Sequence, residues 1–201
     1  DDYTICTKDL EKKINLKTSA VIPVHLYGNP SNIIKIKKII KNKNIKIIED
    51  CAQAHGSKIQ NKHVGTIGEI GTFSFFPGKN LGALGDAGAI TTNNSKLNKT
   101  MRSLRNYGEM NFSTISKRKY YNLFKGFNSR MDEIQASLLN IKLTDLNVDN
   151  LKRKKIANYY ISKIKNPKLK LPTVPPNLDP AWHLFVITTK YRNNLISFLK
   201  K

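Results

Sequence analysis

A lysine stands in a glycine-rich loop between two apolar stretches near the middle of the chain. Lys79 follows a Pro-Gly pair, and Gly82, Gly85 and Gly88 come after it. Glycines at such positions allow the backbone to turn sharply and allow another molecule to come close to it. The loop therefore suits a lysine that offers its amine to a ligand. A surface lysine on a β-hairpin is the alternative that this stretch alone leaves open.

Asp50 is the second residue that could do chemistry. It comes at the end of an apolar run, residues 45–48, that has the length and composition of a buried strand. In sheets of parallel strands, ligands bind beyond the carboxyl ends of the strands. The position therefore predicts a carboxylate at a ligand site. The alternative is an aspartate that caps the turn of residues 52–54.

The elements that would position Asp50 read as a strand, a helix and a strand. Residues 20–24 are a short apolar strand, and Ser31 or Asn32 can cap a helix that continues to Ile40. The apolar run that precedes Asp50 is the second strand. We expect the two strands to be parallel neighbours joined by a right-handed crossover.

Residues 72–76 and 87–92, which flank the lysine loop, are predicted to be buried strands. Residues 57–64 have the pattern of a small hairpin with Asn61 at its turn, and the polar residues 108–119 are predicted to form a loop.

A long helix is predicted to open near residues 126–133, with Asn128 or Ser129 as its N-cap. Its helical pattern resumes at residues 150–165, and residues 182–189 read as a strand. A last helix is expected close to the end of the chain.

The composition indicates a folded α/β protein. The chain has 201 residues and a hydrophobic content of 39%, which supports a buried core. No apolar run approaches the length of a membrane span, and the N-terminus lacks a signal-peptide pattern. The two cysteines, Cys6 and Cys51, have no metal-type spacing. We therefore expect a protein of the reducing cytosol.

The net charge of +21 raises the alternative of a basic nucleic-acid-binding module. Such a module gathers its cations on one face, often with stacking aromatic side chains. Here the lysines are spread along the chain, together with abundant asparagine and isoleucine. The charge is therefore interpreted as a solvated surface, and no nucleic-acid partner is expected.

Taken together, several motifs resemble those of the DegT/DnrJ/EryC1/StrS aminotransferases. They occur in order along the chain at residues 25–28, 50–56, 73–83, 85–89, 126–136 and 182–186. Members of that family use pyridoxal phosphate (PLP) to aminate keto groups of nucleotide-linked sugars. The resemblance covers essentially the whole chain.

The resemblance implies a role for five residues. Lys79 matches the catalytic lysine that binds PLP covalently and moves the substrate proton. Asp50 matches the carboxylate that pairs with the pyridinium nitrogen, and Gln53 a side chain near the cofactor ring and its phenolic oxygen. Ser74 matches a hydroxyl that binds the phosphate. Asn128 matches an asparagine that reaches the phosphate in the neighbouring subunit, so that the active sites of a homodimer are shared.

The resemblance also implies the fold, which is the large domain of a type I (aspartate aminotransferase-like) PLP-dependent transferase. We expect a mostly parallel sheet within residues 1–147, and a linker helix with the start of a small α/β domain within residues 148–201. Because members of the family extend beyond both ends of this stretch, we expect an internal fragment. No metal is expected.

The motif forms are most similar to the branch that aminates dTDP-3-keto-6-deoxyhexoses, with glutamate as the expected amino donor. The runner-up is the branch that acts on 4-keto sugar nucleotides. A relative without transaminase activity, either regulatory or dehydrating, is a further alternative. Sugar 3-dehydratases of this kind have histidine at the position of Lys79, so the lysine favours amino transfer.

Overall fold

The computed structural model describes residues 2–41, 43–109 and 121–200, so most of the loop predicted at 108–119 lies outside the described residues. The helices and strands follow the chain in this order: α1 (Thr7–Lys13), β1 (Ala20–Val21), the 3-10 helix η1 (Leu26–Gly28), α2 (Ile33–Ile39), β2 (Lys46–Asp50), β3 (Lys58–Ile59), β4 (Lys62–His63), β5 (Ile70–Ser74), β6 (Gly88–Thr91), α3 (Ser95–Leu104), α4 (Glu133–Lys163), β7 (Leu178–Asp179) and α5 (Arg192–Leu199).

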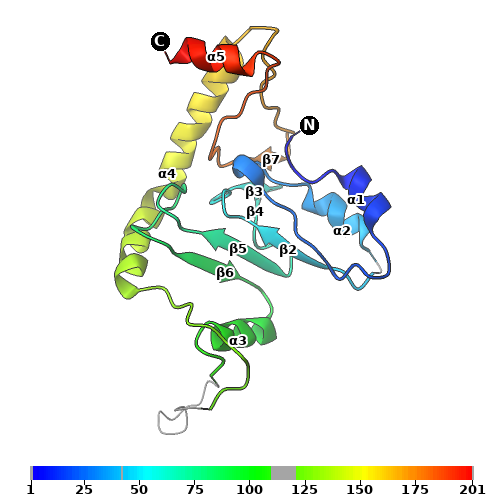
Figure 1. Cartoon of the computed structure of the whole chain (residues 1–201), viewed down its shortest axis with the longest axis vertical. Helices are drawn as coiled ribbons and strands as arrows, with labels where there is room; N and C mark the ends of the chain where they lie inside the picture. The colour runs from blue at the N-terminus through cyan, green and yellow to red at the C-terminus, as the bar shows by residue number, and fades with distance from the viewer. Residues whose placement is uncertain (1, 42, 110–120, 201) are drawn as a thin grey trace.

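The central sheet has the strand order β1-β2-β5-β6 (Figure 1). β1 pairs in parallel with β2 and β2 in parallel with β5, whereas β5 and β6 are antiparallel. The predicted parallel pair of strands around α2 is thus confirmed. The register places Asp50 opposite Thr72. The ends of β2 and β5 therefore meet at one edge of the sheet, which is where ligands bind in parallel sheets.

β5 and β6 are strands, as predicted, but they are not buried as predicted. Only Gly71 of β5 is buried, and β6 alternates between exposed and half-buried residues. Ile90 of β6 is 54% exposed. The reason is that β6 is an edge strand, with no neighbouring strand on its outer side among the described residues.

α2 forms where the sequence indicated, because its cap and its apolar side agree. The side chain of Asn32 accepts a hydrogen bond of 3.0 Å from the backbone N–H of Lys35 at the N-terminus of α2. Ile33 and Ile36, one turn apart, are fully buried against the core. The core cluster joins α2 to β1, β2 and the residues that follow them, and contains Val21, Ile33, Ile36, Ile40, Ile45, Ile47, Cys51, Ala54, Ile59 and Val64.

β3 and β4 form the predicted small hairpin. Gln60 and Asn61 connect the strands with φ values of 48° and 65°. Positive φ at both central residues is typical of the tight turns that suit twisted hairpins. The sequence did not indicate that β3 also pairs with β7, more than one hundred residues later, in an antiparallel ladder that joins Lys58 to Asp179.

α4 differs from the prediction at its start and in its middle. It is one continuous helix of 31 residues, where the pattern had indicated two stretches. Its N-cap is Asp132, so the prediction of an Asn128 or Ser129 cap is wrong. These two residues pair instead with the end of α3, through an antiparallel Asn106–Asn128 bridge and a hydrogen bond from Ser129 N–H to the Arg105 carbonyl.

The strand predicted at residues 182–189 is also wrong. The segment is irregular and makes a single bridge, between Thr188 and Lys170. Trp182, the first residue of the segment, has a φ of 50°, which lies outside the range of an extended strand. The last helix, α5, is confirmed.

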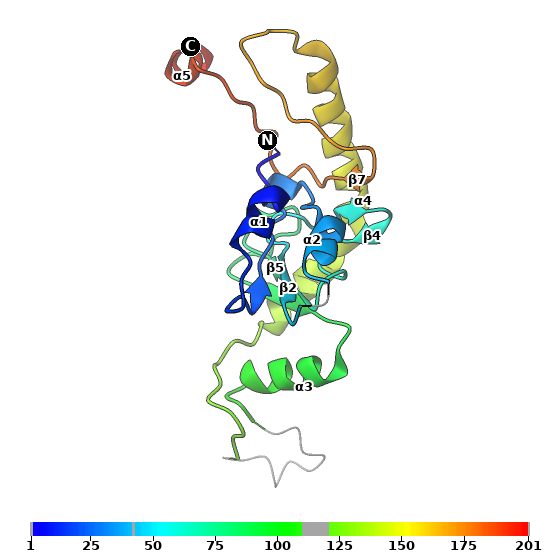
Figure 2. The same cartoon turned by 90° about the vertical axis from the view of Figure 1, so that its right-hand side faces the viewer.

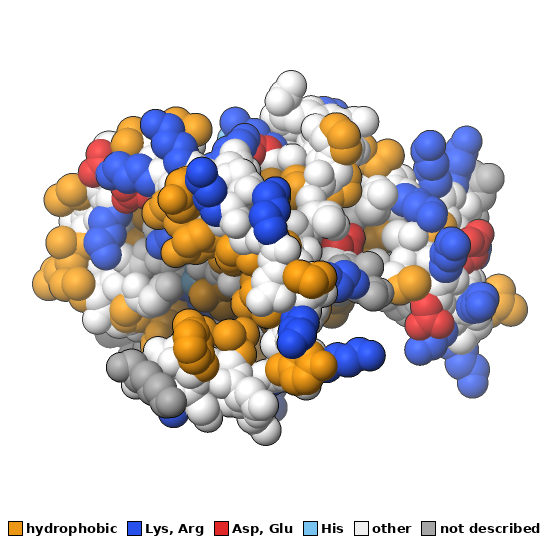
Figure 3. Space-filling view, turned by 90° about the horizontal axis from the view of Figure 1, so that it is seen from above, with side chains coloured by type: hydrophobic (Ala, Val, Ile, Leu, Met, Phe, Trp, Pro, Cys, Tyr) orange, Lys and Arg blue, Asp and Glu red, His pale blue; other side chains and the backbone are white. Residues whose placement is uncertain are grey.

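Figure 2 shows α3 and α5 at opposite ends of the molecule, with α4 extending from the sheet toward α5. On the face in Figure 3, lysine and arginine side chains are dispersed among apolar and polar ones and form no continuous patch. Among the described residues, no helix combines the length and the apolar composition that a membrane span requires.

Candidate active site

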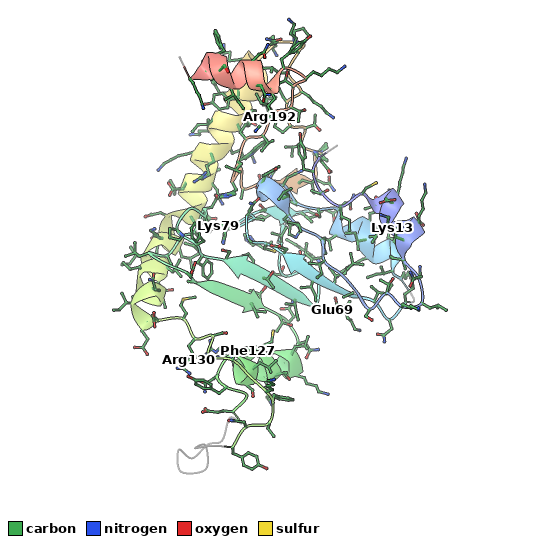
Figure 4. The ribbon with its side chains drawn as sticks, viewed as in Figure 1. Lys13, Glu69, Lys79, Phe127, Arg130 and Arg192 are labelled. Atoms are coloured by element: carbon green, nitrogen blue, oxygen red, sulfur yellow. The ribbon has the colours of Figure 1, made fainter. Side chains whose placement is uncertain are left out.

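The loop between β5 and β6 holds Lys79 in a closed, hydrogen-bonded turn. The backbone N–H of Lys79 donates to the Phe76 carbonyl at 2.9 Å, and the N–H of Ala83 donates to the Phe75 carbonyl at 2.8 Å. A side chain at Gly82 would place its Cβ 2.4 Å from the Pro77 carbonyl oxygen, so only glycine fits where the loop passes back over Pro77. Lys79 is half-buried and lies beside the end of β5 (Figure 4).

A second apolar cluster packs this loop against α4. Leu81 and Ala83 are buried against Leu139 and Leu146 of α4. Lys142 of α4 donates a hydrogen bond of 2.7 Å to the Gly82 carbonyl. The loop is therefore fixed on α4, and the position of Lys79 does not depend on the sheet alone.

Asp50 ends β2 with one carboxylate oxygen oriented by the backbone. Its Oδ1 accepts a hydrogen bond of 3.0 Å from the N–H of Ala52, which is the turn cap of the alternative interpretation. Its Oδ2 accepts no hydrogen bond from the described residues. Capping and ligand binding are thus compatible, because each uses a different oxygen. The half-buried carboxylate can pair with a cationic N–H.

Gln53 is oriented by the turn after β1. Its Oε1 accepts a hydrogen bond of 2.6 Å from the backbone N–H of Tyr27. A backbone N–H can only donate, so this contact identifies the oxygen of the amide. The NH₂ group therefore remains to donate to a ligand oxygen.

Gly28 lies where three segments meet beside Gln53. A Cβ at Gly28 would lie 2.9 Å from the backbone nitrogen of His183 and 3.1 Å from the carbonyl oxygen of Gln53. Its own φ of 87° also favours glycine. The close approach joins the turn after β1, the loop after β2 and the irregular segment that starts at Trp182.

Ser74 is the last residue of β5. Its Oγ accepts a long hydrogen bond of 3.4 Å from the N–H of Phe76. A hydroxyl in that arrangement keeps its O–H free to donate to an anion. Ser74 thus offers a donor where the loop that carries Lys79 begins.

Asn128 is not brought to the other four predicted residues. It is exposed and lies on the segment that pairs with the end of α3. Figure 4 shows its neighbours Phe127 and Arg130 beside α3, on the far side of the sheet from Lys79. Within one chain, Asn128 therefore does not contribute to the site around Lys79.

Two histidines that sequence analysis did not single out lie near Lys79. His55 is 3% exposed, and neither ring nitrogen has a hydrogen-bond partner among the described residues. Burial lowers the pKa of His55 to about 4; an interaction with the Ser74 backbone opposes this lowering, and the charges of His183 and Lys79 add to it. Burial and then the charges of Lys79 and Arg153 lower the pKa of His183. Both rings are therefore neutral at pH 7.

Glu49, directly before Asp50, is the centre of a buried network. Its carboxylate accepts hydrogen bonds from His25 Nε2 and from the backbone N–H groups of Gly65, Ile67 and Gly68. Burial raises its pKa, but the hydrogen bonds from His25, Gly68 and Gly65 outweigh this, so that the pKa lies below its ordinary value. The network fixes the end of β2.

The donors and acceptors of this edge fit pyridoxal phosphate. Asp50 has a free carboxylate oxygen for the pyridinium N–H, Gln53 an NH₂ group for the phenolic oxygen, and Ser74 an O–H for the phosphate. The amine of Lys79 is on the same edge. The sequence motifs indicated these residues but not His55 and His183, whose positions beside Lys79 depend on how distant parts of the chain come together.

Comparison with known proteins shows which sequences and structures the chain resembles. The model of the DegT/DnrJ/EryC1/StrS aminotransferase family matches residues 1–201. The dTDP-3-amino-3,6-dideoxy-alpha-D-galactopyranose transaminase of Aneurinibacillus thermoaerophilus is 51% identical over 190 residues, which are 94% of this chain and 50% of that protein. The dTDP-3-amino-3,4,6-trideoxy-alpha-D-glucose transaminase of Streptomyces venezuelae is 41% identical, over 94% of this chain and 48% of that protein.

A crystal structure of S. venezuelae DesV in complex with a ketimine intermediate superimposes with a TM-score of 0.90 and 40% identity. The match covers 98% of this chain and 52% of that one. The chain thus spans about half the length of the relatives it matches. The likeness confirms the predicted fold, that of type I PLP-dependent transferases.

Proposed function

Because the chain belongs to the DegT/DnrJ/EryC1/StrS aminotransferase family, we propose that the protein containing it is a PLP-dependent aminotransferase acting on a nucleotide-linked keto sugar. The observation that carries the proposal is the shared sheet edge. Asp50 offers one unbound carboxylate oxygen at this edge and Gln53 offers an NH₂ group, and the loop that carries Lys79 begins at the same edge, after β5.

Each residue would have a separate task toward the cofactor. Lys79 would bind it covalently, and Asp50 Oδ2 would accept the pyridinium N–H and keep that nitrogen protonated. Gln53 would donate to the phenolic oxygen and Ser74 to the phosphate. When bound, PLP supplies an electron sink for the bonds at the reacting carbon. The free amine of Lys79 would then move the proton to and from that carbon.

The proposed substrate is a dTDP-linked 3-keto-6-deoxyhexose, with glutamate as the amino donor. Two relatives support the 3-position, since both are named as transaminases of dTDP-3-amino sugars. We propose a homodimer in which Asn128 serves the partner's site, because Asn128 is exposed and lies on a segment that pairs with the residues after α3. The free thiols of Cys6 and Cys51 suit a reducing cytosol.

Cofactor attachment is the direct test of the proposed function. The complete polypeptide should show an absorbance band near the visible edge, and borohydride should fix the cofactor on the peptide that contains Lys79. Lys79→Ala should lose both the band and turnover while the fold is retained. The matched control is Lys96→Ala, which changes an exposed lysine of α3. Attachment to a different lysine would overturn the assignment.

The position of amination needs its own test. The complete enzyme is supplied with glutamate and with each ketosugar nucleotide in turn, and turnover is compared. The proposal expects the 3-keto substrate to be preferred. Preferred turnover of a 4-keto sugar nucleotide would favour the runner-up branch and leave the cofactor assignment intact. Dehydration without amino transfer would identify a non-transaminating relative.

A further inference from the structure

The residue directly after Lys79 connects distant parts of the chain. Nδ2 of Asn80 donates to the Ala181 carbonyl at 2.9 Å and to Oδ1 of Asn150 at 3.0 Å, while its Oδ1 lies 3.0 Å from Nδ1 of His183. Nδ2 of Asn150 in turn donates to the His55 carbonyl at 2.8 Å. We call these contacts the amide chain. It joins the lysine loop, α4, the loop after β2 and the segment near Trp182.

Two backbone carbonyls fix the polarity of the amide chain. A carbonyl oxygen only accepts hydrogen bonds, so the amide atom of Asn80 that faces Ala181 O must be its nitrogen. By the same argument, the atom of Asn150 that faces His55 O is its nitrogen. The oxygen of Asn150 therefore faces the nitrogen of Asn80. The assignment needs no choice between amide flips, which otherwise have to be inferred.

The polarity of Asn80 determines the tautomer of His183. The Asn80 atom beside His183 Nδ1 is an oxygen, and an oxygen of this kind cannot donate. A hydrogen bond across the 3.0 Å contact thus requires the proton on Nδ1. His183 is half-buried, and its surroundings lower its pKa, so the ring carries only that one proton at pH 7.

We propose that Asn80 is a positioning residue that holds His183 in the Nδ1–H tautomer and thereby keeps Nε2 an unprotonated acceptor near the reactive lysine. Three hydrogen bonds of the amide chain run in one direction, from His183 through Asn80 and Asn150 to the His55 carbonyl, so each polarises the next. The tautomer follows from the contacts alone. That Nε2 accepts hydrogen bonds from O–H or N–H groups of the reacting molecules rests on the proposed function.

The charged and titratable groups near His183 favour a neutral ring. Lys79 and Arg153 both disfavour the imidazolium through their positive charges. His55, which interacts electrostatically with His183, is itself neutral at pH 7 because its pKa is about 4. Protonation of His183 near neutral pH would have to overcome these effects, so Nε2 keeps its lone pair.

The tautomer can be read directly by NMR. Two-bond ¹H–¹⁵N correlations of the histidine-labelled complete protein distinguish a ring with Nδ1–H from one with Nε2–H. The wild type should show Nδ1–H for His183, assigned by its loss in His183→Gln. Asn80→Ala should shift the ring toward Nε2–H, which is the commoner tautomer of free histidine. A wild-type ring with Nε2–H, or an unchanged tautomer in Asn80→Ala, would overturn the proposal.

Further variants separate positioning from folding. Asn80→Asp keeps an acceptor for Nδ1–H and adds a negative charge, so the pKa of His183 should rise by about one to three units. An unchanged pKa in a folded Asn80→Asp protein would contradict the proposal. Asn150→Ala should retain Nδ1–H, because Ala181 still orients Asn80. Asn147→Ala, an exposed residue one turn earlier in α4, is the matched control.

The NMR measurement also distinguishes this proposal from the proposed function. If borohydride fixes no cofactor on Lys79 but His183 carries its proton on Nδ1, the proposed function fails and the tautomer assignment stands. If the cofactor is fixed on Lys79 and His183 carries its proton on Nε2, only the tautomer assignment fails.

Discussion

Glu49 Oε2 and His25 Nε2 form a hydrogen bond of 3.1 Å between two side chains that have no exposed surface. His25 Nδ1 accepts a hydrogen bond of 2.9 Å from the backbone N–H of Ser31. Nε2 therefore carries the ring proton and donates it to Glu49. The pair links the turn after β1 to the residue that precedes Asp50.

Glu49→Gln should destabilise the fold by about 3 kcal/mol, because an amide NH₂ would face N–H donors that now meet a carboxylate. Urea unfolding of the complete protein measures this loss. Glu11→Gln, on an exposed position of α1, should change stability by less than about 0.5 kcal/mol. Equal effects of both substitutions would show that the buried network contributes nothing specific.

Because the pKa of Glu49 is lowered, the stability of the fold should depend on pH in the acid range. The pKa of Glu49 in the folded protein lies below its ordinary value of 4.5. Its contribution is therefore complete above about pH 4.5 and is lost as the pH falls through the lower, folded pKa. Unfolding midpoints measured from pH 6 to 3 should decline less steeply at the acid end in Glu49→Gln than in the wild type. Parallel curves would contradict this assignment.

The lowered pKa of His55 predicts a second pH range in which the stability of the fold changes. Its pKa is lowered from 6.5 to about 4 in the folded protein, so the unfolded chain binds more protons between these values. Stability should fall as the pH falls from 6.5 toward 4, by about 3 kcal/mol. His55→Leu should remove most of this slope. Lys62→Leu, at an exposed position of β4, should keep it.

Asp50→Asn should keep the shape of the site and lose its negative charge. Loss of a charged partner in a buried pair costs about 2–5 kcal/mol, which corresponds to a decrease in turnover of roughly 30-fold to several thousandfold. Steady-state kinetics of the complete enzyme measures this, with exposed Asp145→Asn in α4 as the control. Near-normal turnover would mean that Asp50 acts only as the cap of the turn at Ala52.

Complementation tests the proposed role of Asn128. Lys79→Ala and Asn128→Ala should each be inactive, but a mixed dimer would contain one site with both native residues. The isolated mixed dimer should then recover toward half of the wild-type activity, and an equal mixture after complete subunit exchange toward about a quarter. A mixture of Lys79→Ala and Asp50→Asn should not recover, because both residues belong to one chain's site. No rescue of the first pair after verified subunit exchange would place the whole site in one chain.

Local sequence patterns predicted those elements in which the end residues and the apolar residues indicate the same helix or strand. α2 combines an Asn32 cap with isoleucines on one side, and β2 is an apolar run that ends in acid residues. The same reasoning was wrong for residues 182–189, whose composition suits a strand. There the backbone bonds to distant partners, including the Leu184 N–H to the Tyr27 carbonyl at 3.3 Å. No local pattern reports such partners.

The positions of part of the candidate site could be predicted in the same way. Lys79, Asp50, Gln53 and Ser74 come from motifs next to strand ends, and the structure brings them to one edge of the sheet. Asn80, Asn150 and His183 could not be found in this way, because their roles depend on contacts between residues far apart in the chain. In a sequence rich in asparagine, the residue type alone does not identify them.

The amide chain has a consequence for the order of folding. Its hydrogen bonds connect residues that are 70, 95, 101 and 103 positions apart. Contacts of such separation are slow to form, because a long loop must be closed first. The unit of β1, α2 and β2 needs only neighbouring residues and should form early. Pulse-labelling hydrogen exchange should therefore protect the amides of α2 before those of residues 79–83. During synthesis, the surroundings of Lys79 would be completed only after residue 183 has left the ribosome.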